Sequence, residues 1–472
     1  MNGKAYVVGS GPNGLSAAIV LAQAGLAVDV FEAQPTAGGA VRTMELTLPG
    51  FLHDFGSAVH PFAAGSPFFS FLPLRDHGLE WIHSPAPVAH PLDDGTAVVL
   101  EKKLEDAHGT LGLDGGTWCR LLRPFVERWS EFAPEVLRSQ PAIPKHPWLM
   151  ARFGLSAFRS AEHVARSFRS ERTRALFAGL AAHSFLNLDA PISGAFAILL
   201  GVTAHAVGWP VPRRGSQSLT DALVRHLATL GGKVHISSRV DSLDALPKSD
   251  VIMCDVTPKQ LLRIAGRRMA GYYQRSLQKF RYGPGVFKVD YALREPIPWR
   301  APECLRAITV HLGGSFAEIA ASEQAMSLGQ PAERPFVLLA QPSLFDPSRA
   351  PEGRHTAWAY CHIPNGSRVD MLQRIEDQVE RFAPGFREIV VARRTFSPLE
   401  LESMDENLVG GDINGGVLDL RHFVARPTWR HYSTADPAVY LCSSSTPPGG
   451  GVHGMCGYHA ARTALRRFSG KD

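Results

Sequence analysis

Three glycines and one acid near the start of the chain have the types and the spacing that binding of a dinucleotide requires. Gly9, Gly11 and Gly14 follow an apolar run and precede a stretch rich in Ala and Leu, and Glu32 ends the next apolar run. Glycines at these positions permit a tight turn, close approach of backbone to a pyrophosphate, and close packing of a helix on a sheet. The helix N-terminus attracts phosphate, and the acid accepts hydrogen bonds from ribose hydroxyls. A strand–helix–strand unit without a ligand is the alternative. The expected contacts are Gly9, Gly11, Pro12, Asn13, Gly14, Glu32 and Ala33.

Two further glycine-rich loops could complete such a site. Gly38 and Gly39 expose backbone N–H groups, and Arg42 can supply positive charge to a phosphate or to a reduced flavin. The segment Gly449–Gly454 lies between an apolar run and the last expected helix, so its backbone could pack against a flat ring and the helix dipole could stabilise negative charge there. Either segment could instead be a plain surface loop. The contacts expected from the second loop are Gly450, Gly451, Val452 and His453.

One lysine and two histidines are the candidates for catalysis. Lys288 lies within the apolar run Gly285–Leu293, where an ammonium is costly unless it is paired, hydrated or neutral. Snorkelling at a sheet edge is the alternative. His60 and His453 lie in or beside the motif loops and could act as a general acid or base near neutral pH, although such histidines are often only structural donors.

The order of the helices and strands expected along the chain predicts an α/β protein with interleaved domains. A dinucleotide-binding domain is expected to combine residues 1–100, 206–280 and 400–472, with a helical insertion on the substrate side over 101–205 and a mixed-sheet substrate domain over 281–399. Within the first domain, the helix–strand unit around 215–240 could bring a strand at Val240 to an adenine edge. An ordinary unit of the sheet without cofactor contact is the alternative.

Composition excludes several other classes of protein. With 472 residues and a net charge of +5, the chain is too long for one core and has no block of basic residues that would indicate nucleic-acid binding. Its six cysteines include no CxxC pair, so neither a metal site nor a dithiol centre is expected. No signal peptide or transmembrane run is apparent, and a cytoplasmic location is the expectation.

These motifs, together with Asn407–Asp412, Ala425-Arg426-Pro427 and Pro448–Gly454, occur in an order that resembles the flavin amine-oxidase superfamily. The superfamily includes phytoene desaturases and carotenoid isomerases, and the similarity is greatest to the branch of pyridine-nucleotide-disulfide-oxidoreductase-domain proteins. The resemblance implies FAD as cofactor, a Rossmann-type, glutathione-reductase-like FAD domain, and a lysine at Lys288 that holds a water near flavin N5. Many relatives have Gly-Gly-Arg where this chain has Ala40 in the third place, so the group that Arg42 reaches is left open.

The function expected from this combination is an FAD-dependent oxidoreductase of the desaturase or dehydrogenase type. It would remove a hydride equivalent from a C–H bond of a hydrophobic small molecule and pass electrons to oxygen, a quinone or another external carrier. Apolar residues of the insertion, Pro147–Met150, Phe153 and Phe196–Leu200, would favour peripheral contact with a membrane if they are exposed, and a core role is the alternative. The alternatives for the function are a redox-neutral flavin-dependent isomerase, an amine oxidase, and a non-catalytic binding protein of the same fold.

Overall fold

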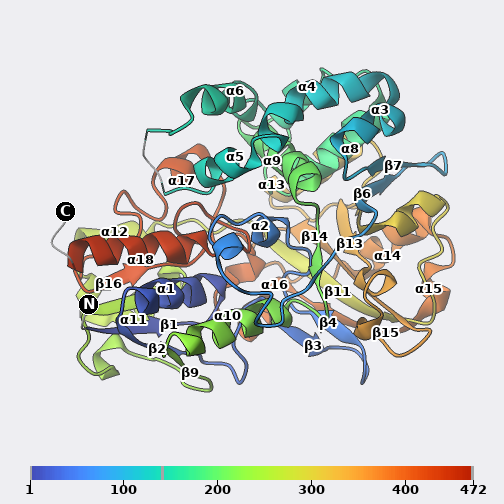
Figure 1. Ribbon diagram of the computed structural model, residues 1–472. Coiled ribbons are helices and arrows are strands. Elements are labelled where there is room, and N and C mark those ends of the chain that lie inside the picture. Colours follow the sequence, from blue (N-terminus) through green and yellow to red (C-terminus); the bar gives the residue numbers. More distant parts are fainter. Residues whose placement is uncertain (1–2, 140–142, 469–472) are drawn as a thin grey trace.

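The computed structural model describes residues 3–139 and 143–468. Two large sheets, two two-stranded sheets and a group of helices make up the described chain (Figure 1). Residues 1–2, 140–142 and 469–472, which the predicted domains include, lie outside the described residues.

The first sheet is a parallel, Rossmann-like sheet in the order β16-β10-β1-β2-β9. Among the helices that accompany it, α1 packs against both α10 and α18. The strands and helices come from three distant parts of the chain, and Figure 1 shows the C-terminal helix beside the N-terminal one. The elements are β1 (Lys4–Val8), α1 (Pro12–Gln23), β2 (Ala27–Phe31), α10 (Gln217–Thr229), β9 (Lys233–His235), β10 (Val251–Cys254), β16 (Val439–Leu441) and α18 (Met455–Phe468).

Small residues allow α1 to lie close to its neighbours. A Cβ atom on Gly14 would lie 2.2 Å from the carbonyl oxygen of Gly9, and one on Gly457 would lie 1.8 Å from that of Asn13. Real side chains cannot occupy such positions, so both glycines are required by close approach of backbone. The first turn of α1 is thereby fixed at the carboxyl edge of the sheet, where ligands of parallel sheets bind.

The second sheet is mixed and has seven strands in the order β15-β11-β14-β13-β12-β6-β7. Its first four strand pairs are antiparallel, while β6 pairs with β12 in parallel. Residues 86–100 were predicted to belong with the dinucleotide-binding domain, but β6 and β7 are hydrogen-bonded into this sheet instead. The strands are β6 (Ala86–Pro91), β7 (Ala97–Leu100), β11 (Gly285–Leu293), β12 (Ala307–Leu312), β13 (Val337–Ala340), β14 (His355–Ile363) and β15 (Val390–Phe396).

The two faces of this second sheet differ in character. Alternate residues such as Tyr291, Val310 and Ala359 form an apolar core with α14 (Leu372–Phe382) and α15 (Phe386–Ile389). The residues between them turn to the opposite face because side chains alternate along a strand. That opposite face carries Thr309 and Trp358, and it forms one wall of the cavity described below.

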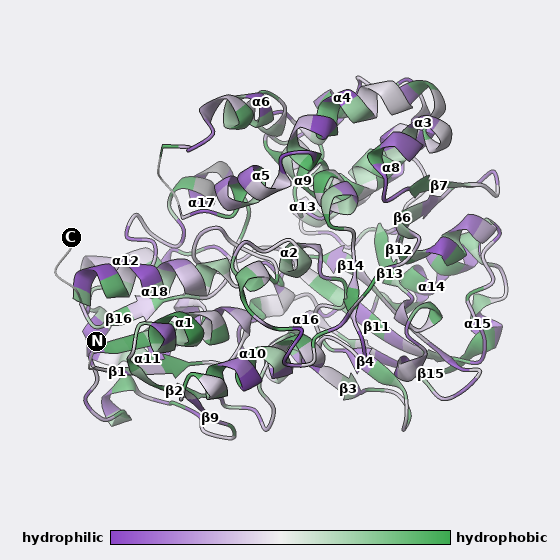
Figure 2. Cartoon of the chain, viewed as in Figure 1, coloured by the Kyte–Doolittle hydropathy of each residue, from purple (hydrophilic) through white to green (hydrophobic). Residues whose placement is uncertain are grey.

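Helices α3 to α9 fall over residues 107–206 and lie together at the top of Figure 1, where α3 and α8 contact strands of the second sheet. Hydrophobic and hydrophilic residues alternate along α4 and α6, as expected of helices with one face on a core (Figure 2). Trp148 on α6 is 87% exposed, whereas Leu149 is buried and Phe153 is half-buried. No helix among the described residues is long and apolar enough to cross a membrane. The helices are α3 (Ala107–Thr110), α4 (Gly115–Val126), α5 (Trp129–Val136), α6 (Pro147–Ala157), α7 (Ala161–Ala165), α8 (Glu171–Ala182) and α9 (Ser193–Ala206).

The remaining elements are β3 (Thr43–Glu45), β4 (Leu52–Asp54), α2 (Pro61–Ala64), β5 (Trp81–Ile82), β8 (Val211–Pro212), α11 (Pro258–Ala265), α12 (Tyr272–Gln278), α13 (Phe316–Ser327), α16 (Pro398–Met404) and α17 (Leu420–Val424). They include short connections, but also α11 and α12, which share an apolar cluster with β10 and β16, and the longer helix α13, which packs against α8.

A buried ion pair ties these connections together. The Arg349 guanidinium donates to the Asp54 carboxylate, and both side chains are fully buried. Asp54 also accepts from Ser216 N at the start of α10 and from Thr43 Oγ1 on β3. Burial alone would raise the pKa of Asp54, but Arg349 and these donors together hold it below the usual range. The pair therefore joins the loop between β13 and β14 to the dinucleotide-binding half.

Replacing Asp54 with Asn should destabilise the fold strongly. The amide keeps the size of the side chain but removes the carboxylate that accepts from the buried Arg349 cation and leaves only Asp346, whose Oδ2 lies 3.7 Å from Arg349 Nε, so a loss of roughly 3–5 kcal/mol in the free energy of unfolding is expected. Urea denaturation of both proteins measures it. Glu80→Gln is the matched control, since it breaks the exposed bidentate pair with Arg213 and should change stability little. Equal losses from the two substitutions would contradict the account.

Candidate functional site

A cavity of about 410 Å³ runs between the carboxyl edge of the first sheet and the polar face of the second. Its lining comes from both ends of the chain, because Gly11 and Glu32 share it with Gly451 and Val452. At its other end lie aromatic side chains, Trp209, Trp358 and Tyr360. Predicted site residues that line it are Gly9, Gly11, Pro12, Asn13, Glu32, Ala33, Gly39, His60, Val240, Gly451 and Val452.

The Glu32 carboxylate is held rigidly at the end of β2. Its Oε2 accepts from Ser10 N at 2.9 Å and from Ser10 Oγ at 2.6 Å, and its Oε1 accepts from Gln34 N at 2.9 Å. The side chain is buried, yet it lines the cavity. An acid in this position, preorganised and desolvated, fits the hydroxyls of a ribose. Asn13 also lines the cavity. Its buried amide oxygen has no protein partner among the described residues, as expected of a group that binds a ligand.

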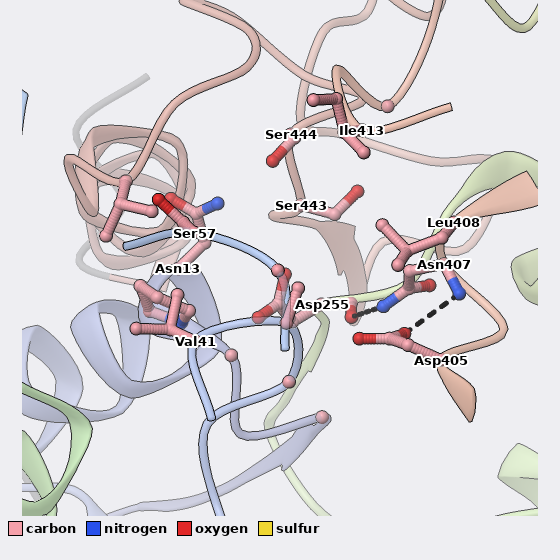
Figure 3. A pocket seen from close by; sticks show the side chains of 18 of the residues that line it. Asn13, Val41, Ser57, Asp255, Asp405, Asn407, Leu408, Ile413, Ser443 and Ser444 are labelled. Carbon is pink, nitrogen blue, oxygen red and sulfur yellow. Dashed lines mark hydrogen bonds between the residues drawn. The ribbon is translucent and has the colours of Figure 1, made fainter. Parts of the chain in front are cut away.

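Asp255 is a lining residue that the sequence analysis did not identify. It follows β10 directly, and its Oδ2 accepts from Gly14 N at 2.8 Å. Figure 3 shows it at the centre of this part of the cavity, with Asp405 and Asn407 beside it; Asn407 Nδ2 donates to the Asp255 carbonyl at 3.1 Å. Burial raises the pKa of the Asp255 carboxyl to about 7, and the nearby Asp405 and Glu32 act in the same direction. The position of Asp255 after an apolar strand was the available signal.

The loop after β2 contributes less than predicted. Gly39 lines the cavity, whereas Gly38 does not and packs instead against Thr220. Arg42 is buried, and its guanidinium donates to the carbonyls of Gly39 at 2.7 Å and Met404 at 3.1 Å. Since those contacts lie within the protein, Arg42 braces the loop against the segment before Asp405. The charge that was expected to reach a phosphate or a ring is directed at carbonyl oxygens.

The C-terminal loop is likewise divided. Gly451 and Val452 line the cavity, but Gly450 and His453 are not among its lining residues in the described chain. His453 Nδ1 accepts from Met455 N at 3.0 Å at the start of α18, and burial lowers the pKa of His453 to about 4. His453 thus accepts a hydrogen bond from the first backbone N–H of α18. The contact that the structure shows for His453 stabilises the start of this helix, and the catalytic role predicted for His453 stays a prediction.

Lys288 is buried behind the cavity wall. Its ammonium pairs with Asp290 on the same strand and lies 5.7 Å from the Trp358 ring and 5.6 Å from the Phe396 ring. Lys288 is not among the described residues that line the cavity, although its cross-strand neighbour Tyr360 is. The ammonium is therefore paired rather than snorkelling. Its predicted role at the reacting atoms stays a prediction.

Val240 and His60 both line the cavity, in settings that differ from those predicted. Val240 lies in a loop, since β9 ends at His235, so the strand expected at Val240 is wrong while its place at the cavity holds. His60 Nε2 lies 2.7 Å from Ser216 Oγ, and its Nδ1 has no partner among the described residues. Burial lowers the pKa of His60 to about 4, so its ring is neutral at physiological pH and is available as an acceptor or donor but not as a cation.

The second sheet supplies an uncharged wall at the far end of the cavity. The rungs of the ladder place Thr309, Ala340 and Trp358 side by side, and Leu338 beside Tyr360 on the next rung of the same face. Trp358 and Tyr360 are stacked with ring centroids 5.6 Å apart and an angle of 10° between the planes. This wall suits a flat or apolar ligand.

Comparison with known proteins agrees with this architecture. Residues 7–72 match the model of the NAD(P)-binding Rossmann-like domain. The chain is 25% identical to pyridine nucleotide-disulfide oxidoreductase domain-containing protein 2 of Mus musculus, over 98% of this chain and 93% of that protein. It is 23% identical to the lycopene-forming phytoene desaturase of Pseudescherichia vulneris, over 70% of this chain and 69% of the other.

Solved structures share the whole fold. An oxidoreductase from Methanosarcina mazei aligns with a TM-score of 0.66 at 17% identity, over 98% of this chain and 100% of that one. Cyclohexylamine oxidase from Brevibacterium oxydans aligns with a TM-score of 0.60 at 12% identity, over 99% and 100%. The fold is thus that of FAD-type oxidoreductases. The chain is therefore similar in sequence and fold to proteins of the flavin amine-oxidase superfamily, as the predicted resemblance holds, and the α/β fold class is confirmed.

The raised pKa of Asp255 predicts that dinucleotide affinity depends on pH. Below pH about 7 the carboxyl is neutral, and above it a carboxylate would oppose the negative charge of a pyrophosphate in the same cavity. The dissociation constant, measured by fluorescence titration of the cofactor-free protein, should therefore rise from pH 6 to pH 8. Asp255→Asn keeps the acceptor for Gly14 N and should flatten this dependence, whereas the control Asp244→Asn, at an exposed side chain, should retain it. An unchanged slope in Asp255→Asn would contradict the assignment.

Proposed function

We propose that the protein is an FAD-dependent oxidoreductase that removes a hydride equivalent from a C–H bond of a small hydrophobic molecule. The observation that carries the proposal is the single cavity that joins the Gly11 and Glu32 segment to Gly451 and Val452, and both to an aromatic wall at Trp358. A nucleotide-binding segment alone would serve a nicotinamide or a flavin cofactor. A site completed from the far end of the chain, facing a separate substrate sheet, favours the flavin.

The chain's own residues divide the work of holding such a cofactor. Glu32 would bind the adenosine ribose, the backbone from Gly9 to Asn13 the diphosphate, and Val240 the adenine. Gly39, Gly451 and Val452 would contact the flavin half. When bound, FAD supplies the chemistry by accepting two electrons and a proton and passing the electrons to an external acceptor.

Around the reacting end, the protein's task is to exclude water and to position the substrate. Trp209, Trp358 and Tyr360 cover the end of the cavity, and the neutral His60 ring lies among its lining residues. Lys288 and Asp290 brace the strand that lies beside Trp358. The water-holding role that the family resemblance implies for Lys288 remains part of this proposal, and a Lys288→Met variant with normal flavin reoxidation would remove it.

The substrate is expected to be mainly apolar, because the wall formed by the second sheet carries no charge. A second cavity of about 180 Å³ lies between helices of the insertion and the C-terminal segments 418–426 and 447–448. Its lining combines Phe153, Phe196 and Leu199 with the charged residues Asp419 and Arg426. Above it, α6 exposes Trp148, Leu155 and Arg152. Peripheral contact of this face with a lipid surface stays a prediction, which co-sedimentation with vesicles would measure.

Anaerobic reduction tests the proposed reaction. The purified protein should be yellow, and its flavin absorbance should bleach on addition of an oxidisable apolar substrate from a panel of polyenes, ketones and amines. Readmitting oxygen or adding a quinone should restore the colour, since the electrons must leave to an external carrier.

Each rival function gives a different outcome in the same assay. A redox-neutral isomerase would convert a polyene without consuming an acceptor, and an amine oxidase would be reduced by amines alone. A colourless protein would overturn the proposal in favour of a non-catalytic binding role.

A further inference from the structure

A half-buried histidine and a fully buried one stand at the aromatic end of the cavity. His183 follows α8 and lines the cavity, and its Nε2 lies 3.0 Å from Nε2 of His311 on β12. His311 is fully buried, and its Nδ1 has no partner among the described residues. Burial lowers the pKa of His183 to about 3 and that of His311 well below the usual range. Both rings are therefore neutral, and one proton joins the two Nε2 atoms.

The surroundings decide which ring donates that proton. If His183 donated, His311 would carry its own proton on Nδ1, which would be a buried N–H without an acceptor. An orphaned buried N–H is rarer than an orphaned acceptor, so His311 Nε2–H is the donor and His183 Nε2 the acceptor. His183 must then carry its proton on Nδ1. That atom makes no hydrogen bond within the described residues, and the His183 side chain is only half-buried, whereas His311 is fully buried. The pair thus presents a fixed N–H donor on a side chain of the cavity wall.

Two more polar groups on this wall lack partners in the described chain. Thr309 Oγ1 and Trp358 Nε1 are both buried, both belong to lining residues, and both stand on the same rung of the second sheet. An indole N–H can only donate, and a threonine hydroxyl can donate. The remainder of this wall, Leu200, Leu338 and Tyr360, is apolar or aromatic. Unpaired donors of this kind, buried in an apolar site, are costly unless a ligand accepts from them.

We propose that the His183–His311 pair, with Thr309 and Trp358, binds the carbonyl oxygen of an otherwise apolar substrate. This inference rests on the proposed function, because it assigns the substrate class of the same site. A carbonyl oxygen accepts from several donors without bringing charge to a wall that has no counter-ion. His183 touches the substrate directly, and His311 is a positioning residue that fixes the proton of His183 on Nδ1.

Binding of a matched pair of probes to the flavin-loaded protein tests the proposal. Chalcone carries a carbonyl between two phenyl groups, and 1,3-diphenylpropene has nearly the same shape without it. Perturbation of the flavin spectrum should show tighter binding of chalcone. His183→Phe should weaken chalcone binding by about 3–10-fold and leave the hydrocarbon unaffected, since one neutral hydrogen bond is lost. His311→Phe should have a smaller effect of the same kind, because His183 is then free to change tautomer.

Further variants separate this role from structural damage. Thr309→Val is nearly isosteric and should lower chalcone affinity selectively, so it tests the site even if His183→Phe folds poorly. His163→Phe on the exposed face of α7 is the control and should change neither affinity. Equal weakening of both probes in His183→Phe and Thr309→Val would overturn the carbonyl site while the flavin-based function stands. A protein without flavin would instead overturn the proposed function itself.

Discussion

Close contact of backbone atoms where α1 crosses β1 and α18 fixes the place of every other part of the site. Gly14 lies against the carbonyl of Gly9, and Gly457 lies against that of Asn13, at distances that leave no room for a Cβ atom. Because helices at both ends of the chain are locked to one strand–turn–helix unit, the loop that precedes α18 must lie over the same sheet edge. Gly451 and Val452 reach the cavity for that reason.

The second sheet turns one face toward this edge, and that face carries charged, polar and aromatic side chains. Apolar side chains on its other face pack against α14 and α15, so the alternation of the strands directs Lys288, Thr309 and Trp358 to the side of the cofactor cavity. The charges among them are paired, as between Lys288 and Asp290. The residues of this sheet that line the cavity are uncharged, and for this reason we propose an apolar substrate with an uncharged polar group.

Local patterns made half of the site predictable. Gly11 and Glu32 were identified because their roles depend on spacing within one strand–helix–strand unit, and both line the cavity. Val240 lines the cavity from a loop and not from the predicted strand, and its contact with an adenine stays a prediction. Residues 86–100 were assigned to the wrong sheet, because their partner strand β12 lies more than 200 residues further along the chain. Asp255, His183 and Thr309 were missed, since only the pairing of distant strands and helices brings them together. No spacing in the sequence reports such contacts.

The central claim is that segments from both ends of the chain form one flavin site. Identification by mass spectrometry of the nucleotide released from the purified, heat-denatured protein tests it most directly. The account predicts FAD in an equimolar amount with the chain, and a marked loss of FAD in Glu32→Ala, which removes the buried carboxylate held by Ser10 and Gln34. Release of a nicotinamide dinucleotide, or of no nucleotide even after incubation with FAD, would contradict it.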